Sequence, residues 1–258
     1  SDLAAMGCTE VVGLTVGLVA PPSTPWPWVE GLYGGLAKAL HAYGGVLLGG
    51  DCSGGAQRLL AITALGRLAA GPIRRGDGRV GDWLVSSGPH GLSRLGLALL
   101  QAPEETRMAR LDGALRERAI QAHRRPRARL DAVRAVIASR PTPTPWRVGG
   151  CDSSDGLAAA VAAVAASSGC GARLHREALP MDPARAALEA AEAWCLGGGE
   201  DFELVLSLEP SWAKELVAAL PGSRVVGDLV EGLAGEVRWA NPDGEGDLIR
   251  REGYSHFG

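Results

Sequence analysis

Residues 152–167 read DSSDGLAAAVAAVAAS, and the interpretation of the whole sequence starts from this stretch. The small and apolar residues from 157 to 167 predict a helix, and two aspartates with a glycine stand directly before it. Carboxylates beside a glycine suit a hard cation such as Mg2+ together with phosphate oxygens, because glycine lets the backbone approach closely. The structural alternative is that Ser154 or Asp155 only caps the helix that begins at Leu157.

Two further segments combine glycines with acids. Gly49-Gly50-Asp51 follows a short apolar run that predicts a strand, and Gly197-Gly198-Gly199-Glu200-Asp201 precedes another such run. For each segment alone, an acid that completes a turn is an equally good interpretation, and this holds for both Asp51 and Asp201. Three such segments in one chain favour phosphate chemistry.

Helix and strand patterns alternate along the chain, which predicts an α/β fold. We expect strands at 10–19, 46–48, 59–65, 83–86, 203–208 and 224–230. We expect helices at 27–43, 92–101, 157–167, 183–194 and 210–220, and an arginine-rich helical stretch over 104–138 that is broken at Pro126. A Pro-Thr run at 141–145 follows this stretch, and we expect two domains, at 1–122 and 123–258.

The composition is that of an ordinary globular chain. Its 258 residues are 46% hydrophobic and 21% charged, with a formal net charge of -3, which excludes a disordered or collagen-like protein. The near-neutral charge also argues against nucleic acid as a partner. No aromatic residues interleave with the arginines of 104–138, so we expect a solvated helix face there instead of an anion or RNA patch.

The sequence also limits the compartment. No run approaches the roughly 20 apolar residues that span a bilayer, and no basic start precedes an apolar run as in a signal peptide. The five cysteines contain no CxxC spacing, so neither a disulfide framework nor a zinc site is indicated. We therefore expect a cytoplasmic protein with no membrane partner.

Several common catalytic motifs are missing from the sequence. There is no GxxxxGK[ST] phosphate loop, and the two lysines, Lys38 and Lys214, lie in helical contexts. No GxGxxG fingerprint joins a strand to a helix, no HExxH occurs, and the five histidines are isolated. These observations exclude a P-loop kinase and disfavour a Rossmann dehydrogenase or a zinc hydrolase. Most of the histidines are expected at the surface or in packing.

Six segments form a set whose order and spacing are informative. They are Ser1-Asp2-Leu3-Ala4-Ala5-Met6-Gly7, Gly49-Gly50-Asp51, Gly81-Asp82, Asp152-Ser153-Ser154-Asp155-Gly156-Leu157, Gly198-Gly199-Glu200-Asp201-Phe202-Glu203-Leu204 and Gly253-Tyr254-Ser255-His256-Phe257. Over essentially the whole chain, this set resembles the thiamine-monophosphate kinase family. Relatives in the same ATP-binding superfamily, such as aminoimidazole ribonucleotide synthetase, share the GGD segment but not the whole set. The resemblance implies a two-domain fold like that synthetase, with a mixed N-terminal sheet and an α/β C-terminal domain.

The resemblance also implies roles for individual residues. It implies Mg2+ ligands at Asp2, Asp51, Asp152 and Asp155, and ATP contacts at Tyr33, Gly50, Asp51, Arg75 and Ser154. It further implies that Glu200 and Tyr254 hold thiamine phosphate, with the ring of Tyr254 against the flat cationic thiamine. Arg74 is the rival of Arg75, which is otherwise a surface charge, and Tyr33 is nearly as well explained as a core aromatic residue.

The reaction that the resemblance implies is direct transfer of the ATP γ-phosphoryl group to thiamine monophosphate, giving thiamine diphosphate and ADP. Both reacting groups are anions, so several Mg2+ ions held by carboxylates, with an arginine nearby, address the main barrier. No protein nucleophile or general base is expected, because the acceptor phosphate is already ionised. The family also implies a homodimer formed by the N-terminal sheets.

The family places a segment ahead of the SDLAAMG stretch that adds metal-binding acids and strands. We therefore expect the N-terminal sheet to be incomplete in this chain, and the dimer and catalysis to be weakened. Two alternatives stay open, a non-catalytic nucleotide-binding fragment and another ATPase of the aminoimidazole ribonucleotide synthetase type. Ala160, where the family commonly has an acid, is expected to be a tolerated surface change.

Overall fold

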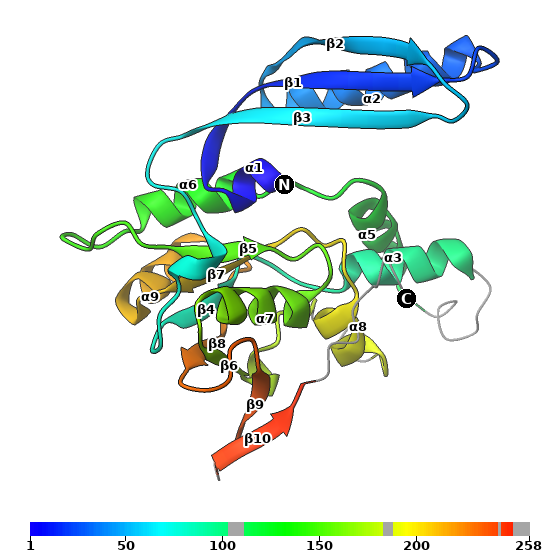
Figure 1. Cartoon of the computed structure of the whole chain (residues 1–258). Helices are drawn as coiled ribbons and strands as arrows, with labels where there is room; N and C mark the ends of the chain where they lie inside the picture. Colours follow the sequence, from blue (N-terminus) through cyan, green and yellow to red (C-terminus); the bar gives the residue numbers. More distant parts are fainter. Residues whose placement is uncertain (103–110, 183–187, 242–243, 250–258) are drawn as a thin grey trace.

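The computed structural model describes residues 1–102, 111–182, 188–241 and 244–249, which form two sheets with helices around them (Figure 1). A three-stranded sheet has the order β2-β1-β3, and a seven-stranded sheet has the order β10-β9-β6-β8-β4-β7-β5. Helices α1 (Asp2–Ala5) and α6 (Leu130–Ala138) lie between the two sheets in Figure 1. The predicted α/β class is confirmed.

In the three-stranded sheet, β1 (Cys8–Ala20) pairs in parallel with β2 (Val46–Gly54) and antiparallel with β3 (Leu59–Leu68). Parallel neighbours need a long crossover, and α2 (Trp26–Tyr43) provides it. The strands and the helix expected here are confirmed, and the sheet is mixed as expected.

The expectation that Gly49-Gly50-Asp51 follows the strand is wrong. These residues lie inside β2, which continues to Gly54. A Cβ atom on Gly50 would lie 1.9 Å from the carbonyl oxygen of Val16 in β1. Glycine is therefore needed here because the two strands approach so closely.

The seven-stranded sheet contains strands that the sequence pattern predicts and strands that it does not. The predicted ones are β4 (Trp83–Ser86), β7 (Leu204–Leu208) and β8 (Arg224–Val230). The others are β5 (Gly149–Asp152), β6 (Gly171–Leu174), β9 (Val237–Asn241) and β10 (Gly244–Leu248). All paired neighbours run antiparallel except β6 and β9, which are parallel.

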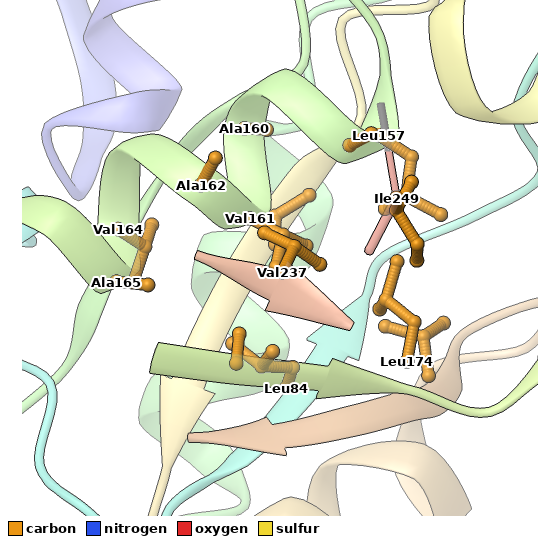
Figure 2. Close-up of a cluster of buried hydrophobic side chains, with 14 of the residues drawn as sticks. Leu84, Leu157, Ala160, Val161, Ala162, Val164, Ala165, Leu174, Val237 and Ile249 are labelled. Carbon is orange, nitrogen blue, oxygen red and sulfur yellow. The ribbon is translucent and has the colours of Figure 1, made fainter. Parts of the chain in front are cut away.

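Successive side chains of these strands enter two different cores. Leu84 packs with α7 (Leu157–Ser167) on one face of the sheet, and Val85 packs with α1, α6 and α9 (Pro210–Ala219) on the other. Figure 2 shows the first core, with Val161 on the helix and Leu84 and Val237 on the strands beneath it. Ala160 is only 5% exposed in this core, so the expectation that it is a surface change is wrong.

Helices α3 (Leu92–Gln101) and α5 (Gly113–Arg124) pack on each other through a small apolar cluster. The expected break at Pro126 is confirmed, because this residue lies between α5 and α6; residues 103–110 of the expected helical stretch lie outside the described residues. Of the helix expected at 183–194, residues 183–187 are outside the described part and residues 188–190 are not helical; the observed helix is α8 (Ala191–Gly197), so the expected bounds are wrong.

The chain passes from one sheet to the other over residues 69–82, which include the short 3-10 helix η1 (Arg75–Asp77); a second one, η2 (Arg176–Ala178), follows β6. The expected domain boundary at 122/123 falls within α5, and the division stays a prediction. Among the residues that the structure describes, no helix combines the length and apolar character needed to cross a membrane.

Candidate functional site

Three neighbouring strands bring two of the predicted segments together. Strand β7 lies between β4 and β5 and is antiparallel to both, with Ser86 opposite Val205 and Asp152 opposite Leu204. The ends of β4 and β5 and the start of β7 therefore lie at one edge of the sheet. Three loops meet at that edge: 87–91 after β4, 153–156 after β5 and 198–203 before β7.

The loops after β5 and before β7 are joined by backbone hydrogen bonds. The Glu200 N–H donates to the Ser154 carbonyl at 2.7 Å, and the Ser153 N–H donates to the Glu203 carbonyl at 2.9 Å. A Cβ atom on Gly156 would lie 2.6 Å from the Leu196 carbonyl oxygen, and Gly156 has a φ of +101°. This glycine thus permits the close contact of the 153–156 loop with the end of α8 (Ala191–Gly197), a reason different from the room for phosphate that the sequence suggested.

The acids of the two loops have different partners. Asp201 accepts hydrogen bonds from the Gly91 and Ser93 N–H groups, at 2.5 and 3.0 Å, and so caps α3. Helix α7 has no side-chain cap, so the alternative that Ser154 or Asp155 caps it is wrong. Asp155 is exposed and accepts from its neighbour Ser154 at 3.3 Å. Asp201 therefore caps α3, whereas Asp155 caps no helix and faces solvent.

Glu200 has an unusual backbone. Its φ is +59°, in the left-handed region that residues other than glycine rarely adopt. Its Oε2 atom lies 3.3 Å from Nδ1 of His123 on α5, and the Ser93 hydroxyl lies 3.1 Å from the same nitrogen. Strained conformations of this kind cluster at functional sites, and the Glu200 side chain remains 58% exposed. This geometry makes Glu200 a candidate binding residue.

Arg75 lies in η1, which packs against β5 and the end of α7, where the Ser168 hydroxyl donates to the Arg75 carbonyl at 3.1 Å. Burial raises the pKa of the Cys151 thiol to about 11, and the guanidinium of Arg75, which hydrogen-bonds this thiol, opposes the shift. Cys151 directly precedes Asp152 in β5, and successive strand residues point to opposite faces, so this contact does not place Arg75 beside the Asp152 carboxylate. Arg74, in contrast, has a side chain that is 65% exposed and lies 3.8 Å from Asp77. The choice between Arg75 and Arg74 as a phosphate contact stays a prediction.

Other predicted residues belong to the three-stranded layer and to α1. Asp51 is exposed on β2 and accepts from the Ser53 hydroxyl at 2.8 Å. Desolvation and a hydrogen bond with the Cys52 thiol raise the pKa of the Tyr33 phenol on α2, so Tyr33 lies against the face of β2 that carries Cys52, whereas the adjacent Asp51 points to the other face. Asp2 is exposed on α1, which packs against β5. Tyr254 lies outside the described residues.

The described residues contain no group of three or more His, Cys, Asp or Glu side chains placed to hold a metal ion. Within this part of the chain, the four predicted ligands therefore do not form one protein cage. Asp152 ends β5 and Asp155 lies in the 153–156 loop that follows it. Mg2+ commonly binds through one or two carboxylates together with substrate phosphates, and this donor set fits such an ion.

A cavity of about 430 Å³ borders this loop. Its lining includes Asp155, Gly197 and Arg94, whose guanidinium lies 5.7 Å from the centre of the Trp194 ring. The Nη1 atom of Arg94 is buried and has no hydrogen-bond partner among the described atoms. The volume is within the range of small-molecule pockets.

Sequence reasoning missed a set of polar residues around these loops. Glu203 accepts hydrogen bonds from the Ser87 hydroxyl and from Arg129. His90, which follows β4, is completely buried. A signal for these residues is present in the sequence, because Ser86 ends the predicted strand and Ser87 and His90 follow it closely, and polar side chains at the end of a buried strand need partners.

Comparison with known proteins places the chain in a family. Residues 1–68 match the family model of the AIR synthase related protein N-terminal domain, and residues 79–240 match that of its C-terminal domain. The chain is 46% identical to the thiamine-monophosphate kinase of Prochlorococcus marinus, over 93% of this chain and 72% of the relative. It is 42% identical to that of Synechococcus elongatus, over 100% of this chain and 76% of the relative.

Solved structures give the same picture. The structure described as AaThiL complexed with AMPPCP and TMP superposes with a TM-score of 0.77 and 25% identity, covering 99% of this chain and 76% of its own. Escherichia coli HypE superposes with a TM-score of 0.68 over 96% of this chain and 75% of its own, and at 21% identity it shows the fold alone. The chain therefore has the two-domain fold of the AIR synthase related proteins and belongs to the thiamine-monophosphate kinase family.

Proposed function

We propose that this chain catalyses the ATP-dependent phosphorylation of thiamine monophosphate to thiamine diphosphate. The observation that carries the proposal is the meeting of the 152–156 and 198–203 loops at one sheet edge, joined by the bond from Glu200 to Ser154. A related structure is described as a complex with AMPPCP, an ATP analogue, and TMP. Both ligand classes thus match what the site is proposed to bind.

Asp152 and Asp155 are the residues that would hold Mg2+, with Asp2 and Asp51 as further proposed ligands. The ion would neutralise charge on the polyphosphate when it is bound. Ser154, Tyr33 and Gly50 are proposed to contact ATP.

The proposed transfer is direct and in line, without a covalent enzyme intermediate. The donor and acceptor phosphates repel each other, so the chain must hold them together against that repulsion. Arg75 is proposed to supply positive charge at the transferred group. The acceptor phosphate is already ionised, so no side chain is assigned as general base.

Glu200 is proposed to bind the substrate. Its carboxylate is exposed beside His123, and a negative charge there complements the cationic ring of thiamine. Tyr254 remains proposed as a second substrate contact on the basis of the sequence resemblance.

The protein is proposed to form a homodimer through the three-stranded sheet. Strands β2 and β3 are both at sheet edges, and Val46, Leu59 and Ile62 are 57%, 56% and 44% exposed. Exposed apolar residues on open sheet edges favour association. Light scattering of the wild type and of the Ile62→Glu variant tests this. A monomeric mass for both proteins would contradict the proposed dimer.

The free state of all five cysteines supports the proposal that the protein resides in the reducing cytoplasm.

The test of activity is a coupled assay for ADP release with thiamine monophosphate and Mg2+. The Asp152→Asn variant should lose turnover, whereas Glu215→Gln, on the exposed side of α9, should keep it. Folded wild-type protein that releases no ADP in response to thiamine monophosphate would overturn the proposal. Thermal stabilisation by a formylglycinamidine-type nucleotide instead would point to another ATPase of the superfamily.

A further inference from the structure

Three buried polar side chains form a hydrogen-bonded series beneath the segment that carries Asp152 and Asp155. They are Ser86, His90 and Ser153, and each of these residues has an exposed fraction of 0%. His90 Nε2 lies 2.8 Å from the Ser153 hydroxyl oxygen, and His90 Nδ1 lies 3.3 Å from the Ser86 hydroxyl oxygen. These hydrogen bonds therefore connect the loop after β4 with the loop after β5.

The partners of the ring indicate the direction of the bond. The Gly88 carbonyl, 3.3 Å from His90 Nδ1, can only accept a hydrogen bond. The Ser86 hydroxyl already donates to that carbonyl at 2.7 Å. A neutral ring with its proton on Nδ1 satisfies these groups, and Nε2 then accepts the Ser153 hydroxyl proton.

Ser153 is the residue through which this bond reaches the candidate site. It stands between Asp152 and Ser154, and its N–H donates to the Glu203 carbonyl. The carbonyl of the following residue, Ser154, accepts a hydrogen bond from the Glu200 N–H. Helix α7 has no side-chain cap to hold the start of the loop in place. The side chain of Ser153 is thus anchored in the protein interior, while Asp152 is half-buried and Asp155 is exposed.

His90 itself is held by the backbone. Its N–H donates to the Pro180 carbonyl at 2.7 Å, and it directly precedes Gly91, whose N–H donates to the Asp201 carboxylate. The imidazole is therefore fixed at one end by the protein backbone and bound at the other end to the loop. Because the site is buried, loss of the acceptor would leave the Ser153 hydroxyl without this partner.

We propose that His90 is a positioning residue of the kinase site: through Ser153 it holds the 152–155 loop in the conformation that binds the metal-nucleotide complex. This inference rests on the proposed function. His90 does not touch substrate in this role. Its effect is on the nucleotide side of the reaction, and the Glu200 side keeps its own contact with His123.

The test compares two substitutions at this position. His90→Gln keeps a hydrogen-bond acceptor that reaches the position of Nε2, whereas His90→Met has similar length without such an acceptor. We expect His90→Met to lower kcat/KM for Mg-ATP by about 10- to 100-fold, with a smaller change in KM for thiamine monophosphate. His90→Gln should restore most of the loss. Equal losses in both variants, or a loss confined to thiamine monophosphate, would overturn the inference.

Hydrogen exchange provides a readout that does not depend on activity. We expect faster amide exchange at 153–156 in His90→Met and in Ser153→Ala. The matched control is Ser207→Ala, which removes another fully buried hydroxyl, one that donates to Asp82 away from this loop. Unchanged exchange at 153–156 in His90→Met, or the same increase in Ser207→Ala, would contradict the positioning role even if the wild type does not phosphorylate thiamine monophosphate.

Discussion

Arg129 and Glu203 form an ion pair that joins the start of α6 to the loop before β7, and their side chains are only 11% and 13% exposed. Burial disfavours the charge of Arg129, but its hydrogen bonds with Asp131 and the attraction of Glu203 outweigh this and raise its pKa. Glu203 also accepts from Ser87. The pair therefore anchors the loop that carries Glu200.

Replacement of Arg129 by methionine should be strongly destabilising, because the enclosed Glu203 carboxylate would lose its cation. We expect the free energy of unfolding to fall by about 3–5 kcal/mol, measured by urea denaturation. The double variant Arg129→Met/Glu203→Gln should recover part of this loss. A cost as small as that of an exposed ion pair would show that the enclosure does not matter.

Replacement of Asp201 should lower stability, whereas replacement of Asp155 should weaken binding. Asp201→Ala removes the acceptor for two N–H groups at the start of α3 and should lower stability by about 1–2 kcal/mol. Asp155→Asn should leave the thermal midpoint nearly unchanged and weaken Mg2+-dependent binding of AMPPCP, measured by calorimetry. Full Mg2+-dependent affinity in Asp155→Asn would contradict its assignment as a cation ligand.

Gly50 should not tolerate a side chain. Alanine there would place Cβ 1.9 Å from the Val16 carbonyl oxygen, so β2 must move away from β1, and we expect a loss of about 1–3 kcal/mol or more. Gly54→Ala is the matched control, since it lies in the same strand and a Cβ there meets nothing within 4 Å. Thermal unfolding of the two variants measures the difference, and equal midpoints would be inconsistent with the close strand approach.

Asp131 gives a pH-dependent contribution to stability. Burial opposes its charge, but the hydrogen bond from Arg129 and the attraction of that guanidinium lower its pKa. The stabilisation is therefore present above the ordinary value of the carboxyl pKa and disappears as the pH falls through the lowered value in the folded protein.

The Asp131→Asn variant tests this dependence. The side chain is 49% exposed, so we expect a loss of less than about 1 kcal/mol near neutral pH. The difference from the wild type in urea midpoints should shrink as the pH is lowered below roughly 4. Glu215→Gln, which removes an exposed acid elsewhere, is the control for net charge. A constant difference at all pH values would contradict the role of the charged pair.

Sequence patterns predicted the longer elements well. Helix 92–101 and strand 83–86 were predicted with the observed bounds, because their apolar spacing is regular and Gly91 and Gly81-Asp82 stand directly before them. The four missed strands are only four or five residues long. Strand β5 reads GGCD, which has too few apolar side chains to show alternation; its pairing with β7 is decided by contacts distant in sequence.

The sequence predicted the motifs of the candidate site but not the buried polar side chains that hold its loops. The glycine and acid segments at 152–156 and 197–201 were identified, and they do lie together. The different roles of Asp201 and Asp155 could not be predicted, because the N–H groups that Asp201 caps are at the start of a helix about 110 residues earlier in the chain. His90 was missed because the chemistry of an isolated histidine depends on its spatial neighbours.

The position of β7 between β4 and β5 also bears on synthesis of the protein. During translation β4 and β5 are made first, yet neither pairs directly with the other in the finished sheet. The strand that joins them emerges only when residues 204–208 leave the ribosome. The nascent chain therefore cannot assemble the edge where the three loops meet until most of its length has been made, and this long-range closure should make the site one of the last parts to form.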